Sequence, residues 1–511
     1  MAAWPLVQRG IDVLMLERGP WVDRGPENWA PEGTLTNTPY FHEGRSFVAE
    51  SDGGPRDLAA CSCVGGPSVF YGGVSLRFRE EDFRPDQEIT TDSGAQWPFD
   101  YQTLQPYYAK VEGILQVAGA AGVDPTEPPR ESPYTAAPAP LSPVSQRIST
   151  AAASMGLRPF RLPLAINYGA RPQGRECIAC GTCDTFACGI GAKNDLAVQV
   201  IPTLLRQGME LGTETEVTRL TERNGRVAAV QCTHRVTGER LEFTADSFVL
   251  AAGALATPYL LLTSGLEALN SAGDSVGRYL TRHCSGIVFG AYPGLPKHEG
   301  RFHKQVGIND YYFGHPQAGD SEAKHPRGKL GNIQQTQTPS IGTVRTELSS
   351  VASFFLTPLV RRITGLLVIA EDRPRYDNRV RLNPSVTDTA GNPGLVVEHN
   401  YSQRDLDARR ALGGRAKAIH RKAGALGHYM HEIDTFSHAL GTVRMGSDEA
   451  RDPLDDRGRF RGLENLYVTD GAALPTSAGV NPSLTIAANA MRIGQGIAEL
   501  WEGLTHPGGT A

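Results

Sequence analysis

The stretch NLYVTDGAALPTSAGVNPSLTIAANAMR, residues 465–492, decides the fold class of this chain. Its first residues, 465–470, form a short apolar run that is typical of a buried strand. An Asp-Gly pair, which favours a tight turn, follows the strand. A helical pattern then covers 480–500, with Pro482 where proline favours the first turn of a helix. A strand, a turn and a long helix in this order predict an α/β fold.

Two further segments predict strands of the same kind. Residues 11–17, IDVLMLE, form a nearly continuous apolar run that ends in Glu17. In a dinucleotide-binding fold, an acid at this tip binds the adenosine ribose. Residues 241–251 form another strand, and the turn at Ala252 and Gly253 leads into a helix. We expect both strand ends to lie against a dinucleotide.

A loop with two glycine pairs follows, CSCVGGPSVFYGGVSLRFR at 61–79. Glycine permits close approach of the backbone to a ligand, so this loop is suited to lie flat against a planar group. Its glycines, which would allow that approach, are Gly65, Gly66, Gly72 and Gly73. An ordinary turn is the alternative interpretation.

Length and composition narrow the class of protein. At 511 residues the chain exceeds the roughly 250–300 at which one core stops growing, so we expect two domains. A net charge of -5 gives no electrostatic argument for binding nucleic acid. No apolar run approaches the ~18–20 residues of a membrane span. The first residues lack the pattern of a secretory signal, so we expect a cytoplasmic protein.

Periodicity and capping predict most of the other elements. Helices are expected over 97–118 and from 405 to 425, the latter with Ser402 as its N-terminal cap. An elaborated loop or irregular sheet is expected over 300–350. The further strands that we expect are 215–220, 226–232 and sheet within 366–382.

Four cysteines are clustered in CIACGTCDTFACGIGAK, namely Cys177, Cys180, Cys183 and Cys188. Their C-x2-C-x2-C-x4-C spacing matches a ferredoxin-type iron–sulfur motif in its first three positions and departs from it at the fourth. Such a cluster would pass single electrons to an external carrier. A zinc site, a disulfide pair and reduced structural thiols are the alternatives.

Four segments in the right order resemble the glucose–methanol–choline (GMC) oxidoreductases: 64–78, 249–266, HALGTVRMGS at 438–447, and 465–492. VGRYLTRH at 276–283 supports the resemblance. It implies a Rossmann-like FAD-binding domain assembled from discontinuous segments, and an α+β substrate-binding domain on an antiparallel sheet. The corresponding ranges are 1–85, 200–290 and 460–511 for the first domain, and 86–199 and 291–459 for the second.

The resemblance also implies site residues. His438 matches the family's catalytic histidine, and Asn481 matches the second polar residue that faces the flavin. Asp470, Gly471 and Pro482 match contacts to the phosphate–ribityl arm. Val217 matches the residue whose backbone pairs with the adenine edge.

The reaction implied is oxidation of a CH–OH group of an alcohol, sugar or glycoside, with FAD as the hydride acceptor. Oxygen, a quinone or a cytochrome would be the final electron acceptor. The family's first strand and its G-x-G-x-x-G turn would precede Met1, so we expect the natural start to lie upstream. A flavin-free inactive fragment and a family lyase are the alternative functions.

Overall fold

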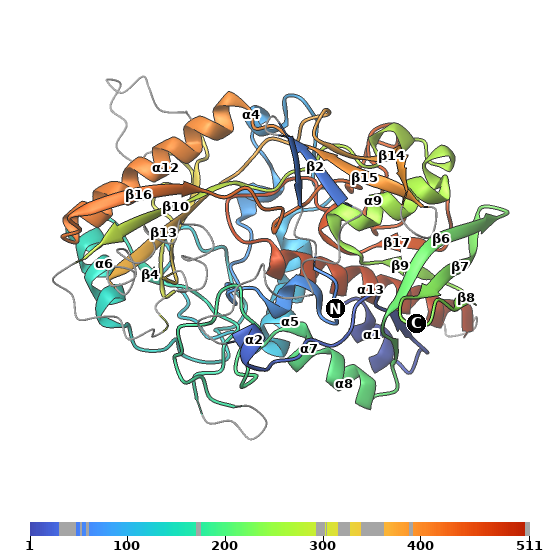
Figure 1. Ribbon diagram of the computed structural model, residues 1–511, viewed down its shortest axis with the longest axis horizontal. Helices are drawn as coiled ribbons and strands as arrows, with labels where there is room; N and C mark the ends of the chain where they lie inside the picture. Colours follow the sequence, from blue (N-terminus) through green and yellow to red (C-terminus); the bar gives the residue numbers. More distant parts are fainter. Residues whose placement is uncertain are drawn as a thin grey trace.

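The computed structural model describes residues 1–29, 47–51, 54–57, 61–169, 175–292, 302, 304–314, 328–338, 362–387 and 392–505. They form a mixed α/β fold. Figure 1 shows an antiparallel sheet beneath a long helix on one side, and parallel strand pairs with the C-terminal helix on the other.

The largest sheet has six antiparallel strands. In spatial order they are β16 (Gly427–Glu432), β10 (Cys284–Ala291), β13 (Ile363–Ala370), β12 (Gly331–Thr336), β11 (Val306–Ile308) and β4 (Phe160–Arg161). Since β10 begins at Cys284, the domain boundary that the sequence predicted at 290 falls inside this strand.

Helix α12 (Gln403–Lys422) crosses one face of this sheet, and α6 (Pro143–Ser154) lies beside it. The apolar face of α12 packs on β10, β12 and β13 in a core of its own. Close packing there depends on Gly290 of β10, where an added Cβ would meet His420 Nδ1 of α12 at 2.4 Å. Ser402 caps α12 and forms a capping box with Asp405, as the sequence predicted.

Two parallel strand pairs lie on the side of the fold that holds the C-terminal helix. β1 (Leu14–Leu16) pairs with β5 (Glu210–Gly212), and β9 (Phe248–Leu250) pairs with β17 (Leu466–Val468). Three helices accompany them: α1 (Ala3–Gln8), α9 (Gly253–Ser264) and α13 (Ser483–Thr505). These elements share the largest core with the glycine loop and with α5 (Tyr101–Ile114).

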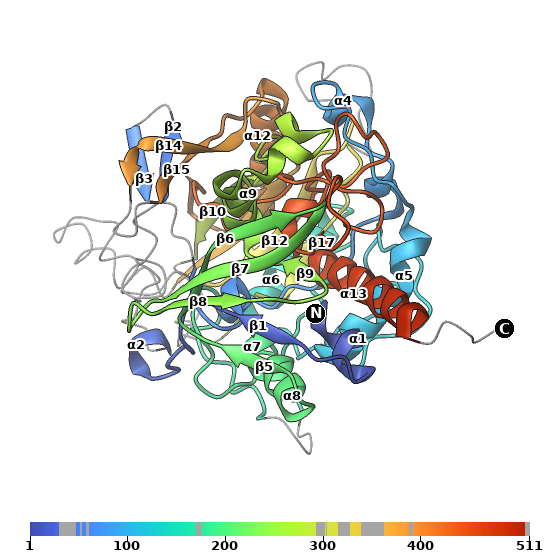
Figure 2. The same cartoon turned by 90° about the vertical axis from the view of Figure 1, so that its right-hand side faces the viewer.

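Two smaller sheets complete the fold. Strands β6 (Thr215–Arg223), β7 (Arg226–His234) and β8 (Arg240–Phe243) form an antiparallel meander, which Figure 2 shows between α9 and β1. The other sheet has the order β14 (Arg379–Thr387), β15 (Pro393–Glu398), β2 (Phe47–Ser51) and β3 (Gly54–Asp57). Strand β15 pairs with β2 in parallel across more than 300 residues of sequence, which periodicity does not predict.

The remaining elements are short. They are the helices α2 (Pro26–Trp29), α4 (Gln87–Thr90), α7 (Leu196–Gln199) and α8 (Ile201–Arg206), and the single 3₁₀ turns η2 (Gly66–Val69), η3 (Glu80–Phe83), η4 (Leu266–Leu269), η5 (Gly273–Ser275) and η6 (Gly471–Ala473).

The predicted elements agree with the structure in type more than in extent. The strand expected over 241–251 is divided into β8 and β9, and the sheet expected within 366–382 is divided into β13 and β14. Residues 300–350 contain β11 and β12, although 315–327 and 339–350 lie outside the described residues. In the part of the chain that is described, no helix is long and apolar enough to cross a membrane.

Gly290→Ala is expected to lower the free energy of unfolding by about 1–3 kcal/mol, because the added methyl group displaces His420 from the interface between α12 and β10. Gly414→Ala is the matched control. Gly414 is an exposed residue of α12, and an added Cβ there would have nothing within 4 Å. This control is expected to raise stability by about 0.5–1 kcal/mol. Urea unfolding of the two variants checks both signs, and destabilisation by both would contradict the explanation.

Candidate active site

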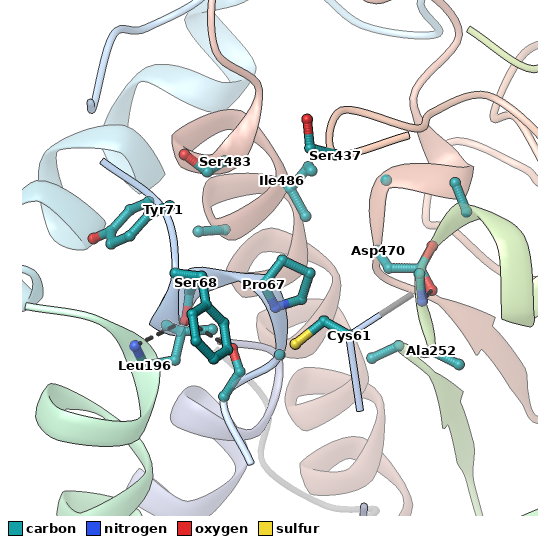
Figure 3. A pocket seen from close by; sticks show the side chains of 18 of the residues that line it. Cys61, Pro67, Ser68, Tyr71, Leu196, Ala252, Ser437, Asp470, Ser483 and Ile486 are labelled. Carbon is teal, nitrogen blue, oxygen red and sulfur yellow. Dashed lines mark hydrogen bonds between the residues drawn. The ribbon is translucent and has the colours of Figure 1, made fainter. Parts of the chain in front are cut away.

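A single large cavity of about 2410 Å³ runs from the ends of the parallel strands to the six-stranded sheet. Figure 3 shows Pro67, Asp470 and Ile486 around it, contributed by the glycine loop, the turn after β17 and helix α13. The cavity is thus enclosed by segments that are far apart in the sequence.

Of the residues that the sequence predicted for catalysis and FAD binding, all but Gly73 line this cavity: Glu17, Gly65, Gly66, Gly72, Val217, Ala252, Gly253, His438, Asp470, Gly471, Asn481 and Pro482. The four predicted metal ligands, Cys177, Cys180, Cys183 and Cys188, do not. Gly73 is buried behind the wall, where its carbonyl oxygen accepts a hydrogen bond from Ala165 N–H. An added Cβ there would meet Ile166. Gly73 therefore supports the loop from behind.

His438 lies against a second histidine, His283, which the sequence analysis did not single out. Their Nδ1 atoms are 2.9 Å apart. The other ring nitrogen of His283, Nε2, lies 2.9 Å from the carbonyl oxygen of Ser477 and 3.1 Å from that of Ala478. Carbonyl oxygens only accept hydrogen bonds, so His283 Nε2 carries a proton.

This arrangement determines the tautomer of His438. Burial lowers the pKa of His283, so its ring is neutral and its Nδ1 is an acceptor. His438 Nδ1 must therefore carry the proton that the two Nδ1 atoms share. Burial, assisted by His283 and Lys304, lowers the pKa of His438 to about 3. The neutral ring thus keeps an unprotonated Nε2, which can accept a proton from a ligand.

Asn481 is oriented by strand β12. The side-chain amide of Gln334 donates through Nε2 to Asn481 Oδ1 at 2.9 Å. This bond fixes the amide orientation of Asn481, and no described residue accepts from its Nδ2, which can donate to a ligand in the cavity. The site therefore offers a proton acceptor on His438 and a hydrogen-bond donor on Asn481.

Two adjacent carboxylates after β13 hold the loop that precedes Asn481. Glu371 Oε1 accepts from Ala478 N–H at 3.0 Å. Asp372 Oδ1 accepts from the hydroxyl of Ser477 and from the backbone N–H of His283, both at 3.0 Å. Since Ala478 has a positive φ of 54°, the loop needs such anchors to keep its shape.

A buried lysine compensates these charges. Lys329 Nζ lies 2.6 Å from Glu371 Oε2 and also pairs with Asp82. Tyr312 donates its hydroxyl proton to Asp82 at 2.8 Å, and its oxygen accepts from Gly479 N–H at 3.0 Å. The ion pairs therefore lie one layer behind the cavity and reach the same loop.

Asp470, which also lines the cavity, joins the turn after β17 to helix α9. Its carboxylate accepts from Gly253 N–H at 2.8 Å, Ala472 N–H at 2.8 Å and the hydroxyl of Thr257 at 2.5 Å. These donors occupy both oxygens, so Asp470 shapes the backbone around the cavity.

Glu17 lies at the tip of β1, as predicted, and accepts from Gly19 N–H at 2.8 Å. Burial raises the pKa of Glu17 to about 7. A carboxylate with so few donors in a buried cavity wall is a ready acceptor for the hydroxyl groups of a ligand.

The structure does not support the predicted iron–sulfur cluster. Within the described residues, which include Cys177, Cys180, Cys183 and Cys188, no group of three or more Cys, His, Asp or Glu side chains is arranged to hold a metal ion. Burial raises the pKa of Cys183 to about 12, so this thiol stays protonated. Lys193 organises the segment instead, because its ammonium donates to the carbonyl oxygens of Tyr71, Cys183 and Phe186.

The cysteine segment nevertheless contributes to the cavity, through Asp184. This residue pairs with Lys304 and accepts from Thr336, and all three line the cavity. Sequence reasoning missed Asp184 and Lys304 as well as His283 and Gln334. Only His283 carried a signal, since it ends the segment VGRYLTRH.

Comparisons with known proteins agree with this architecture. Two family models, both described as GMC oxidoreductase, match residues 40–285 and 374–490. The chain therefore belongs to the GMC oxidoreductase family of FAD flavoproteins.

Curated relatives include two proteins that are each 32% identical over 98% of this chain and 89% of their own length. They are the 6'''-hydroxyparomomycin C oxidase of Streptomyces lividus and the paromamine 6'-oxidase of Streptomyces fradiae. A 2-methyl-1,2-propanediol dehydrogenase of Mycolicibacterium austroafricanum is 26% identical over 96% of this chain and 92% of its own. Among solved structures, a pyridoxine 4-oxidase from Mesorbium loti has the same fold, with a TM-score of 0.66 and 19% identity over 98% of this chain and 97% of that one.

Lys329→Met is expected to lower the free energy of unfolding by about 3–5 kcal/mol, because Asp82 and Glu371 then remain buried without a counter-charge. Lys110→Met on the exposed face of α5 is the matched control, with an expected change within about 0.5 kcal/mol. Chemical unfolding measures both variants. Equal stability of the two would show that the ion pairs do not hold the loop.

Proposed function

We propose that this chain is an FAD-dependent enzyme that oxidises a CH–OH group of an alcohol or sugar, with His438 as the base that accepts the hydroxyl proton. The observation that carries the proposal is that His438, with an unprotonated Nε2, and Asn481, whose amide can donate, line the same cavity.

The residues around the cavity fit FAD. Glu17 would accept from the ribose hydroxyls, and the backbone at Gly66 and Gly253 leaves open space where a Cβ would stand. The first turn of α13, which begins beside Pro482, presents helix N–H groups to the cavity. When bound, FAD supplies the acceptor for the carbinol hydride.

The protein's own groups would handle the proton and the developing charge. His438 Nε2 takes the hydroxyl proton, and Asn481 Nδ2 donates to the oxygen as negative charge develops on it. His283 keeps the accepting lone pair of His438 on the cavity side by accepting from Nδ1. The Ser477 and Ala478 carbonyl oxygens in turn hold His283 in the tautomer that permits this.

Replacing the two cavity residues tests their roles separately. His438→Ala is expected to slow flavin reduction by about 10²–10⁴-fold, the usual contribution of a positioned general base. Asn481→Ala is expected to cost about 10–10³-fold, through the loss of one donor to the developing alkoxide. Stopped-flow absorbance with FAD-loaded protein measures both rates, and Lys110→Ala, on the exposed face of α5 and not among the cavity-lining residues, is the control. Reduction of the His438 variant at the normal rate would refute the assignment.

The lowered pKa of His438 predicts a pH profile. Because the lowered pKa keeps His438 neutral at pH values well below the usual range of histidine titration, the rate of flavin reduction is expected to stay constant between about pH 5 and pH 8. His283→Phe removes the acceptor for His438 Nδ1, and the rate is expected to fall about 10–10³-fold as the wrong tautomer is populated. His283→Asn, which keeps a side-chain oxygen near the Nδ1 position, should recover part of the rate. An acid limb near pH 6.5 in the native enzyme, or equal rates in the two variants, would contradict this explanation.

A further inference from the structure

A second polar group faces the same cavity, and the chemistry proposed above does not use it. Lys304 Nζ lies 2.6 Å from Asp184 Oδ2, and the hydroxyl of Thr336 donates to the same oxygen at 3.2 Å. Asp184 comes from the cysteine segment, Lys304 from just before β11, and Thr336 from the end of β12. We call these three residues the Asp184 triad.

The triad has hydrogen-bonding capacity that the described residues leave unused. The Lys304 side chain is only 5% exposed, yet in the described part of the chain Asp184 is the sole hydrogen-bond partner of its ammonium. Asp184 Oδ1 likewise has no donor among the described residues. A nearly buried ammonium with two unused donors is unfavourable unless a ligand in the cavity accepts from it.

The triad lies beside the reacting site. Gln334, which orients Asn481, and Thr336 are two residues apart on β12, so they face the same side of the strand at a separation of about 7 Å. An added Cβ on Gly72, in the glycine loop, would meet both Asp184 Oδ1 at 2.2 Å and Lys304 Nζ at 2.5 Å. A ligand held at Asn481 and His438 therefore reaches the triad if it is about as broad as a sugar ring.

The charges of the triad select the chemical class of this ligand. Lys304 would repel a cationic group of the ligand, and Asp184 would repel an anionic one. Since the two charges lie only 2.6 Å apart, a charged group could not approach one without meeting the other. A hydroxyl group both donates and accepts, so it can give its proton to Asp184 Oδ1 and accept from Lys304 Nζ. The matching ligand is neutral and carries several hydroxyl groups.

We propose that Asp184 and Lys304 bind a hydroxyl group of the substrate other than the one that is oxidised, so that the enzyme selects polyhydroxylated substrates over simple alcohols. This inference rests on the proposed oxidation at His438. Thr336 acts through Asp184, since its hydroxyl holds Oδ2 and leaves Oδ1 directed to the ligand.

The test compares a polyol with a simple alcohol. D-glucose and glycerol represent the first class and 1-propanol the second, and stopped-flow flavin reduction gives the rate divided by the dissociation constant for each. The native holoenzyme is expected to favour the polyols by at least ~10-fold. Asp184→Asn and Lys304→Met are expected to lower the value for the polyols by ~10–100-fold, the effect of losing a charge-assisted hydrogen bond, which is a larger loss than for 1-propanol.

The double variant Asp184→Asn/Lys304→Met guards against misfolding, because it leaves no uncompensated charge. It is expected to show the same loss for polyols, while Lys110→Met, on the protein surface, shows none. Equal losses for polyols and 1-propanol, or a native enzyme without preference between them, would overturn the inference and leave the proposed oxidation standing. Failure of every alcohol to reduce the flavin would overturn the proposed oxidation, and this inference with it.

Discussion

The buried carboxylates of Glu371 and Asp372, directly after β13, are the interaction on which the rest of the site depends. Between them they accept hydrogen bonds from the loop at Ser477 and Ala478 and from the backbone of His283. Both the reactive loop and the histidine pair are thus fixed to the end of one central strand. Without these acceptors, a loop with an alanine at positive φ would lose the geometry that directs Asn481 into the cavity.

The charged groups that hold the loop lie apart from the two groups that would react with the substrate. Lys329 neutralises Glu371 and Asp82 one layer behind the cavity wall, whereas the groups at the reacting position, His438 and Asn481, are neutral. His283 donates from Nε2 to the carbonyl oxygens of the loop and accepts at Nδ1 from the base, His438. A chain of single donors and acceptors, rather than a nearby carboxylate, therefore sets the tautomer of His438, while burial keeps its ring neutral.

Sequence patterns within a short segment predicted the elements that depend on that segment alone. The apolar run before Glu17, the Ser402 cap and the strand, turn and helix over 465–492 all formed as expected. Strand β12, GNIQQT, gave no apolar signal because most of its buried side chains are polar, and they bond to partners distant in sequence such as Asn481 and Ser145. The His283 and His438 pair is likewise set by tertiary packing across 155 positions. The cysteine spacing failed as a metal motif because spacing alone does not determine how a loop folds.

The two faces of β12 have different surroundings, one on the side of Asn481 and the cavity and the other in the core beneath α12. Thr336 lines the cavity and Gln334 bonds to Asn481, whereas Ile333 packs in the core beneath α12 and Gln335 bonds to Ser145 and Thr364. Alternation along a strand therefore divides its residues into one set that contacts the ligand and another that maintains the core. Selection acting on substrate choice can change the first set while the second stays constant. This short strand is thus a natural place for relatives with one scaffold to diverge in what they oxidise.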